Sequence, residues 1–320
     1  MPPERKTAAA AAAAAASGSR GSHRQKAAAA EPVDAGAVVE PAAAASLRLL
    51  TQNVWCHYPM SFVKGCAHAM PGWDCAGRLR RLAAHVAAAG CDVVCVQELF
   101  LLRLWPLADN SCNFDLFAGL MAAAGLEHHT DPRGSLRPDR WLGQNSGVAI
   151  FSRHPLEACE AVDFEATAEA ANTKGFVVAD VRVRCRTVRL VSAHCDARDW
   201  PAKAAQIAQL ALHLASRQAE VPCDAVLVCG DFNVCPQTRD AGGYDDGQQY
   251  LHLTAKLGRL DLQDLWAPAE SEPTEGRATL DHIFLNAAAW EVGSKRVARV
   301  QSEAGLAVSD HHGLEVELRW

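Results

Sequence analysis

Long apolar runs are missing from this sequence of 320 residues. A transmembrane helix needs about 20 consecutive apolar residues. The closest stretch, Leu99–Leu107, is shorter and contains Arg103 and Pro106. We therefore expect no membrane-spanning helix. Cysteine pairs of the CxxC type are missing too, so the 12 cysteines do not follow a zinc-finger pattern.

The cysteines lie instead in or beside apolar runs, as Cys91, Cys95 and Cys229 do. A free cysteine in such a run behaves as a small hydrophobic residue. This usage favours a reducing compartment. It leaves open a single bridged pair, such as Cys159–Cys195.

An excess of positive charge is also lacking. Lys and Arg number 31 against 37 Asp and Glu, which gives a net charge of -6 and a pI of about 6.1. Proteins that hold long nucleic acids carry a basic surface. Here the only arginine clusters are short: Arg78, Arg80 and Arg81, then Arg182, Arg184, Arg186 and Arg189. The second cluster alternates along a predicted strand and indicates a solvated strand face. This balance argues against nucleic acid as a partner.

Residues 1–45 have low complexity, with nine consecutive alanines at Ala8–Ala16. The first thirty residues contain five Lys or Arg and one acidic residue, a composition compatible with an organelle transit peptide or with a disordered leader. We exclude this segment from the fold and expect one domain over residues 46–320.

From Ser46 onward, apolar β-branched runs alternate with two strong helical patterns. Helices are expected at Ala76–Gly90, Pro201–Ala219 and Gln248–Gly258. Strands are expected at Leu47–Val54, Asp92–Glu98, Ser146–Ser152, Gly175–Val183, Thr187–His194, Ala225–Asn233, Thr279–Asn286 and Gly313–Trp320. This order predicts an α/β (α+β) fold, a four-layer α/β/β/α sandwich with two packed mixed sheets and helices outside.

Polar residues recur where the apolar strands end. The stretch Val226–Pro236 is the clearest example, because Gly230 closes a buried run and Asp231 and Asn233 follow. Residues two apart in an extended chain point to the same side. The other strand ends present Asn53, Gln97, Glu98, His194, Asp281, Asp310 and His311. We expect these side chains to meet at one edge of the sheets.

The residue types suit metal-assisted hydrolysis of a phosphate ester by water. Glu98 supplies a hard oxygen ligand of the kind that Mg²⁺ prefers. Asp231 and Asn233 offer a base and a phosphate-orienting amide. Asp281, inside an apolar run, needs a partner, and His311 would complete an acid–imidazole pair. His194 would supply a second cationic donor.

The segments TQNVW, VVCVQE, NSGVAIFSR, VSAHCDA, GDFNV, TLDHIF and SDHHG occur in the order typical of the endonuclease/exonuclease/phosphatase superfamily, which has the deoxyribonuclease I-like fold. The resemblance spans about residues 47–319. Within the superfamily the chain most resembles the neutral sphingomyelinases, through WDCAGRLRRLAAHV, NSGVAIFSRHPL, the KGF strand at Lys174–Phe176, and HCDARDWPAKAAQIAQL.

The resemblance implies a role for each matching residue. Glu98 would be the main Mg²⁺ ligand, with Asn53 beside it and Asp310 in the metal or polar network. Asp231 would orient or deprotonate the attacking water, and Asn233 would hold the phosphate. His311, oriented by Asp281, would be the general base or a phosphate donor. His194 would stabilise the phosphate charge. Whether one or two metal ions bind remains open, and Mn²⁺ or Co²⁺ could substitute for Mg²⁺.

The resemblance implies hydrolysis of sphingomyelin or a related phosphosphingolipid to ceramide and a phosphorylated headgroup. The alternatives are a nuclease or RNA deadenylase of the same fold and an inactive scaffold. Two departures stand out: Ala287–Val308 has one aromatic residue, Trp290, where bacterial relatives have an aromatic-rich hairpin, and His282 stands where Tyr is usual. Leu99–Leu107 is expected to be a buried helix or loop. We expect a monomer, cytoplasmic or peripherally attached to a membrane.

Overall fold

Two six-stranded sheets dominate the computed structural model of the chain. It describes residues 46–56, 74–101, 103–104, 108–109, 111–131, 145–168, 173–236, 247–266, 272–302 and 304–320. Sheet A has the order β13 (Glu291–Ala298), β14 (Gly313–Arg319), β1 (Ser46–Cys56), β2 (Val93–Leu99), β6 (Ala149–Ser152), β5 (His128–His129). Only β1 and β2 pair in parallel in this sheet.

Sheet B has the order β11 (Leu262–Asp264), β12 (Asp281–Asn286), β10 (Ala225–Asp231), β9 (Arg186–His194), β8 (Gly175–Val183), β7 (Leu156–Asp163). Here β10 and β9 pair in parallel, and the other neighbours are antiparallel. Each sheet therefore has a central parallel pair, whose carboxyl ends carry the polar residues singled out above. A short ribbon of β3 (Arg103–Leu104) and β4 (Ala108–Asp109) stands apart from both sheets.

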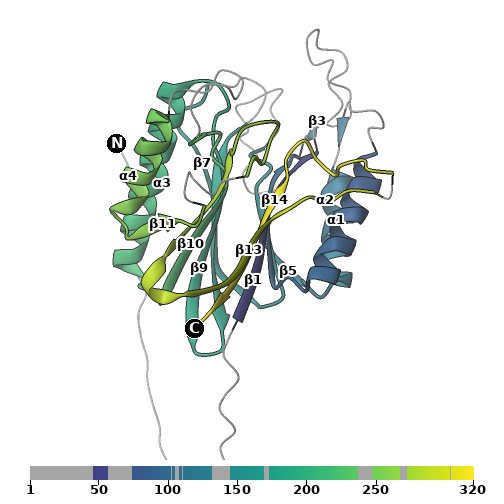
Figure 1. The fold of residues 1–320 in the computed structure, drawn as a ribbon, viewed down its shortest axis with the longest axis horizontal. Helices are drawn as coiled ribbons and strands as arrows, with labels where there is room; N and C mark the ends of the chain where they lie inside the picture. The colour runs from purple at the N-terminus through teal and green to yellow at the C-terminus, as the bar shows by residue number, and fades with distance from the viewer. Residues whose placement is uncertain are drawn as a thin grey trace, which may run out of the picture. The chain divides into compact units, whose positions relative to one another are not determined.

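Helices cover the outer face of each sheet (Figure 1). α1 (Cys75–Ala89) and α2 (Ser111–Ala123) pack on sheet A, and α3 (Trp200–Glu220) and α4 (Gln248–Gly258) pack on sheet B. A third apolar cluster, with Leu49, Cys95 and Leu227 among its members, fills the space between the sheets. These layers confirm the predicted four-layer α/β/β/α sandwich. A 3₁₀ turn, η2 (Ala287–Ala289), precedes β13.

The helix ends follow from local sequence. The Asp74 side chain accepts a hydrogen bond from the Gly77 N–H and caps α1, and Gly90 ends that helix in the left-handed conformation. Asp199 caps α3 in the same way through the Ala202 N–H, with proline in the first turn. These signals explain why the predicted helices at Ala76–Gly90 and Pro201–Ala219 agree with the structure.

Several elements were not predicted: α2, β5, β7, β11 and β13. The sequence of α2, SCNFDLFAGLMAA, is apolar on most sides and lacks a clear helical period. Strands β7 and β13 lie at sheet edges and bury almost none of their residues, so they carry little apolar signal. Of the stretch Leu99–Leu107, Leu99 ends β2, Phe100 and Leu101 are buried and β3 follows, while residues 102 and 105–107 lie outside the described residues.

One expectation about the arginines was wrong. The predicted solvated strand face holds for Arg182 and Arg184, which are exposed, but Arg189 is buried. Its guanidinium forms two hydrogen bonds with the Asp180 carboxylate, at 2.8 and 2.9 Å, on the neighbouring strand. The register that sets Arg189 opposite Asp180 supplies the countercharge that burial requires.

Cys159 and Cys195 are both free cysteines, so the pair left open above is not bridged. Cys159 is exposed on β7, whereas Cys195 is buried. Among the residues that the structure describes, no helix is both long and apolar enough to cross a membrane.

Candidate active site

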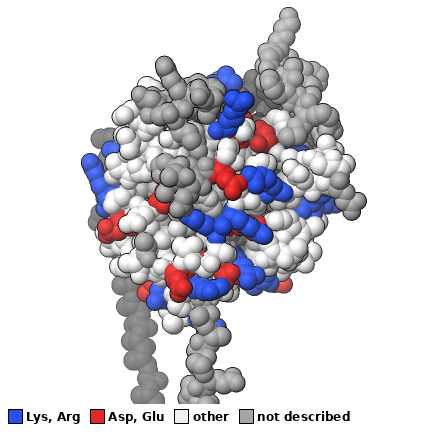
Figure 2. Space-filling view, in the orientation of Figure 1, with Lys and Arg blue, Asp and Glu red and all other residues white. Residues whose placement is uncertain are grey.

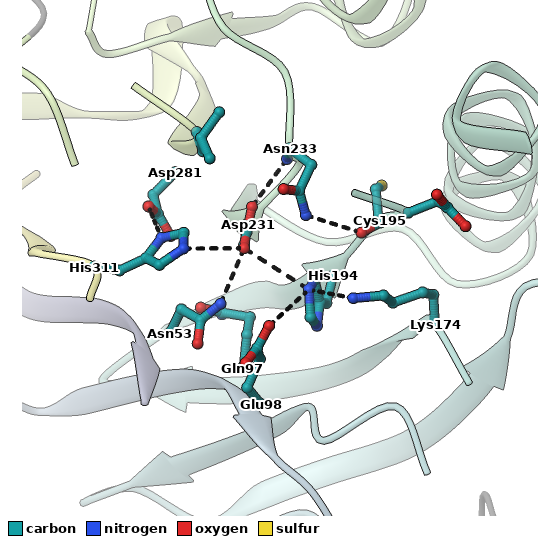
Figure 3. A network of polar contacts seen from close by, with 12 residues as sticks. Asn53, Gln97, Glu98, Lys174, His194, Cys195, Asp231, Asn233, Asp281 and His311 are labelled. Carbon is teal, nitrogen blue, oxygen red and sulfur yellow. Dashed lines mark hydrogen bonds and ion pairs between the residues drawn. The ribbon is translucent and has the colours of Figure 1, made fainter. Parts of the chain in front are cut away.

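The strand registers bring the predicted polar residues to one edge of the sandwich. In sheet B, His194 on β9 pairs with Asp231 on β10, and Asp231 pairs in turn with Asp281 on β12. In sheet A, Asn53 on β1 pairs with Gln97 on β2. The carboxyl ends of these central strands face one another across the two sheets, and the side chains point toward one another (Figure 3).

Gly230 allows the close approach that this row needs. Its φ is 137°, and a Cβ atom there would lie 2.0 Å from the Ala193 carbonyl oxygen. Any other residue would push β9 and β10 apart, just before His194 and Asp231. The close approach of β9 and β10 therefore explains why the GDFN segment begins with glycine.

Two of the candidate residues have left-handed backbones. Glu98 has a φ of 60° and Asn233 a φ of 52°. This conformation costs a residue with a side chain about 1 kcal/mol, and such strain is concentrated at functional sites. At Glu98 the chain is packed against Gly147, where a Cβ atom would lie 3.0 Å from the Glu98 Cα. The carboxylate is thus aimed by the backbone as well as by its rotamer.

Asp231 is the centre of the cluster. Its Oδ2 accepts a hydrogen bond from the Asn53 side-chain amide at 3.0 Å, and its Oδ1 accepts one from the Asn233 N–H at 2.9 Å. The Nε2 atoms of His194 and His311 lie 3.7 and 3.8 Å from Oδ2. Burial is the main cause that raises the pKa of Asp231 to about 7, with the Asp281 charge adding to the shift.

His311 and Asp281 form the predicted acid–imidazole pair. The His311 Nδ1 lies 2.8 Å from the Asp281 Oδ2, and both residues are buried. Burial alone would lower the pKa of His311, but the Asp281 carboxylate, followed by that of Asp231, raises it well above the usual value. His311 is therefore held as a cation with its Nε2–H directed at Asp231. This geometry can deliver a proton to a phosphate ester.

His194 has a different neighbour. Its Nε2 lies 2.7 Å from the Nζ of Lys174, and both side chains are buried. An ammonium group only donates hydrogen bonds, so the His194 Nε2 accepts in this pair and the ring is neutral. The positive charge on this side therefore belongs to Lys174. Sequence reasoning did not select Lys174 as a site residue, although the KGF segment that contains it was noted.

A divalent cation fits beside Glu98. Ligand atoms of Glu98, His194 and Asp231 all lie within 4.8 Å of one another, and because the His194 Nε2 accepts from Lys174, the Glu98 and Asp231 carboxylates are the candidate donors to the ion. Two of these residues offer carboxylate oxygens, the donors that Mg²⁺ prefers. A cation would also balance the buried negative charge and keep Asp231 ionised. Asp231, Asp281 and His311 form a second such group, but there the carboxylate of Asp281 is engaged by the imidazole.

The remaining predicted residues take different places. Asn233 donates its side-chain N–H to the Cys195 carbonyl at 3.1 Å, beside the cluster. Asn53 lies next to Asp231, and its Oδ1 accepts from the Trp55 N–H. Asp310 is exposed and belongs to neither group of close ligand atoms. Its Oδ1 accepts from the Ser309 hydroxyl.

Two further buried residues support the cluster. Gln97 donates to Thr51 on β1 and to Ser192 on β9, so it joins the two sheets next to the site. Lys203 on α3 donates to the Asn233 carbonyl oxygen at 2.5 Å. The sequence shows Lys203 only as one polar position in an amphipathic helix, which gives no signal for this contact.

No curated protein matches this chain. Among solved structures, sphingomyelinase C from Streptomyces griseocarneus has 22% identity and a TM-score of 0.58, over 85% of this chain and 99% of that one. A mutant beta toxin from Staphylococcus aureus with bound magnesium ions has 18% identity and a TM-score of 0.59, over 85% and 99%.

The human Nocturnin catalytic domain with bound sulfate is similar to the same degree, with 22% identity and a TM-score of 0.59, over 85% of this chain and 94% of that one. These likenesses show a common fold. The model of the Endonuclease/Exonuclease/phosphatase family matches residues 50–311, a range that includes Asn53, Glu98 and His311. The chain therefore belongs to the Endonuclease/Exonuclease/phosphatase family.

Proposed function

We propose that this protein is a Mg²⁺-dependent phosphodiesterase of the phospholipase C type that cleaves sphingomyelin or a related phosphosphingolipid to ceramide and a phosphorylated headgroup. The observation that carries the reaction type is the buried Asp231 Oδ2, flanked by the His311–Asp281 pair on one side and by Glu98, His194 and Lys174 on the other. The substrate class rests on the sphingomyelinase-like motifs and on the similar fold of sphingomyelinase C.

In this proposal each residue acts on a water molecule or on the phosphate. Asp231 orients the attacking water and accepts its proton or passes it on. His311, held by Asp281, donates its Nε2–H to the phosphate or to the leaving oxygen. The Asn233 amide holds the phosphate, and Lys174 with His194 offsets its charge. A Mg²⁺ ion held by Glu98, with Asp231 and Asn53 near it, would supply charge stabilisation at the phosphate oxygens.

A nuclease or deadenylase of the same fold is the second candidate, because the Nocturnin domain is as similar as sphingomyelinase C. The net charge of -6 favours the lipid enzyme, because proteins that hold long nucleic acids carry a basic surface. On the face in Figure 2, Lys and Arg are interspersed with Asp and Glu rather than gathered in one basic patch. Along β1, β13 and β14 the ion pairs Arg296–Glu315, Arg319–Glu317 and Arg48–Glu317 follow the same alternation.

The domain bounds, the oligomeric state and the location of the protein are also part of this proposal. We take residues 46–320 as the catalytic domain and residues 1–45 as a leader. The protein would act as a monomer, in the cytoplasm or peripherally at a membrane, where its substrate lies.

A substrate panel tests the proposal. The purified full chain would be incubated with sphingomyelin, inositol phosphosphingolipid, lysophospholipid, phosphoinositide, plasmid DNA and poly(A), with Mg²⁺ or EDTA. We expect headgroup release from a sphingolipid that EDTA abolishes. Glu98→Gln should lose at least about 100-fold, while Glu127→Gln, an exposed glutamate, serves as the matched control. Cleavage of poly(A) or DNA alone would overturn the substrate class.

A further inference from the structure

His282 is a wholly buried histidine directly behind the candidate site. It follows Asp281 on β12, and consecutive residues of a strand point to opposite faces. Asp281 faces His311, whereas His282 faces the helical layer, where its ring packs against Tyr250 and Phe232. The reaction proposed above makes no use of it.

Both ring nitrogens of His282 face hydrogen-bond acceptors. Its Nδ1 lies 2.8 Å from the Asp264 Oδ2, and its Nε2 lies 2.8 Å from the Val234 carbonyl oxygen. A neutral ring has one N–H and could satisfy only one of them. Two acceptors at hydrogen-bonding distance therefore require a doubly protonated ring. Its countercharge is Asp264, whose side chain is itself buried and also accepts from the Tyr250 hydroxyl at 3.0 Å.

The carbonyl that His282 holds belongs to the residue after Asn233. The Asn233 backbone is left-handed, so its conformation needs support from its surroundings. The preceding carbonyl, that of Asn233 itself, accepts from the buried Nζ of Lys203 at 2.5 Å. Two successive carbonyls of this turn are thus each held by a buried cationic side chain, one from α3 and one from β12.

We propose that His282 is a positioning residue that, through the Val234 carbonyl, keeps Asn233 in the geometry needed to bind the phosphate. The inference rests on the proposed function for the role of Asn233. An imidazolium suits this place because it offers two donors in opposite directions, one to Asp264 and one to the turn. A tyrosine, the usual residue at this position in the family that this sequence resembles, offers a single hydroxyl donor.

Three full-chain variants test the inference. His282→Phe removes both donors, His282→Gln keeps one N–H donor that can reach Val234, and Tyr250→Phe removes a hydroxyl from the same network without touching the turn. The substrate is bis(p-nitrophenyl) phosphate with saturating Mg²⁺, because this small diester reports phosphodiester cleavage whatever the natural substrate.

For His282→Phe we expect kcat to fall about 10- to 100-fold, the range for losing a charge-assisted hydrogen bond that supports a site residue. The Mg²⁺ concentration for half-maximal rate should stay unchanged, because Glu98 is not affected. His282→Gln should recover part of kcat, and Tyr250→Phe should stay within about 3-fold of wild type. Equal kcat in His282→Phe and Tyr250→Phe, with circular dichroism showing both folded, would overturn the inference.

A readout independent of activity accompanies the kinetics. Nitrogen-15 NMR of histidine-labelled protein, with the His282 signals identified by their loss in His282→Phe or His282→Gln, reports the protonation of each ring nitrogen. We expect both to carry hydrogen at pH 7. A His282 Nε2 that carries no hydrogen would contradict the inference by itself. A wild type that cleaves no phosphodiester would instead contradict the proposed function.

Discussion

The two sides of Asp231 carry the same residue type in opposite surroundings. On the His311 flank, formed by Asp281 and His311, the imidazole faces a carboxylate at 2.8 Å. On the His194 flank, formed by Lys174, His194 and Glu98, the imidazole faces an ammonium at 2.7 Å. Yet each Nε2 lies nearly the same distance from the Asp231 Oδ2, 3.8 and 3.7 Å.

The difference shows that a histidine's role is set by the partner behind it. Asp281 holds His311 as a cation, and a cation with one nitrogen directed at the centre can donate a proton. Lys174 makes His194 an acceptor, so the positive charge of that flank belongs to the Lys174 ammonium group. We infer that the His311 flank moves the proton and the His194 flank balances charge beside Glu98.

The largest expected effect separates the two histidines. His311→Gln should lower kcat by about 10³-fold, because it removes a general acid–base group. His194→Gln should lower it by about 10- to 100-fold, since the glutamine oxygen can still accept from Lys174. Steady-state kinetics on bis(p-nitrophenyl) phosphate measures both. Equal losses in the two variants would remove the distinction between the flanks.

Lys174 gives the next largest effect. Lys174→Met should raise KM and lower kcat together, by about 10- to 100-fold in kcat/KM, because the charge opposite the phosphate is lost. Lys174→Arg should keep part of the activity. The matched control is Lys256→Met, which removes a lysine from α4, away from the described cluster. Full activity of Lys174→Met would show that His194 works without its ammonium partner.

The smallest effect concerns stability and extends the comparison to His282, which like His311 is paired with a carboxylate. Burial alone would lower the pKa of His282, but Asp264 raises it. Because the folded pKa exceeds the unfolded value of about 6.5, this stabilisation is complete below pH 6.5. It is lost as pH rises through the folded pKa.

Chemical denaturation in EDTA should therefore show a gap in unfolding free energy between wild type and His282→Phe that narrows above pH 6.5. The slope is about 1.4 kcal/mol for each pH unit until the folded pKa is reached. The gap for Tyr250→Phe should not change between pH 6 and 8. A His282→Phe gap that is constant over that range would mean that His282 is not a cation.

Much of the site could be predicted from the sequence, because polar residues that end or interrupt an apolar strand can be recognised there. Asp231 and Asn233 follow an apolar run broken by glycine, and Asp281 is a carboxylate inside another run, so their meeting with His311 was expected. The central strands of both sheets and three of the four α-helices in the described part of the chain were predicted for the same reason: their apolar faces are continuous.

The rest depends on contacts between distant segments. Lys174 and Lys203 are unremarkable in the sequence, and only the packing of β8 and α3 shows that their ammonium groups are buried against His194 and Asn233. Arg189 was assigned to a solvated face because its partner, Asp180, lies on another strand. Edge strands β7 and β13 bury too few residues to leave an apolar period.

The most direct test of the account follows oxygen from water to product. The full chain and Asp231→Asn would be incubated with sphingomyelin vesicles in water enriched in oxygen-18, with Mg²⁺ or EDTA, and the products analysed by mass spectrometry. The account predicts that the wild type releases phosphocholine with one oxygen-18 and unlabelled ceramide. It predicts this release with Mg²⁺ and not with EDTA. Equal release of phosphocholine by Asp231→Asn, or release by the wild type in EDTA, would contradict it.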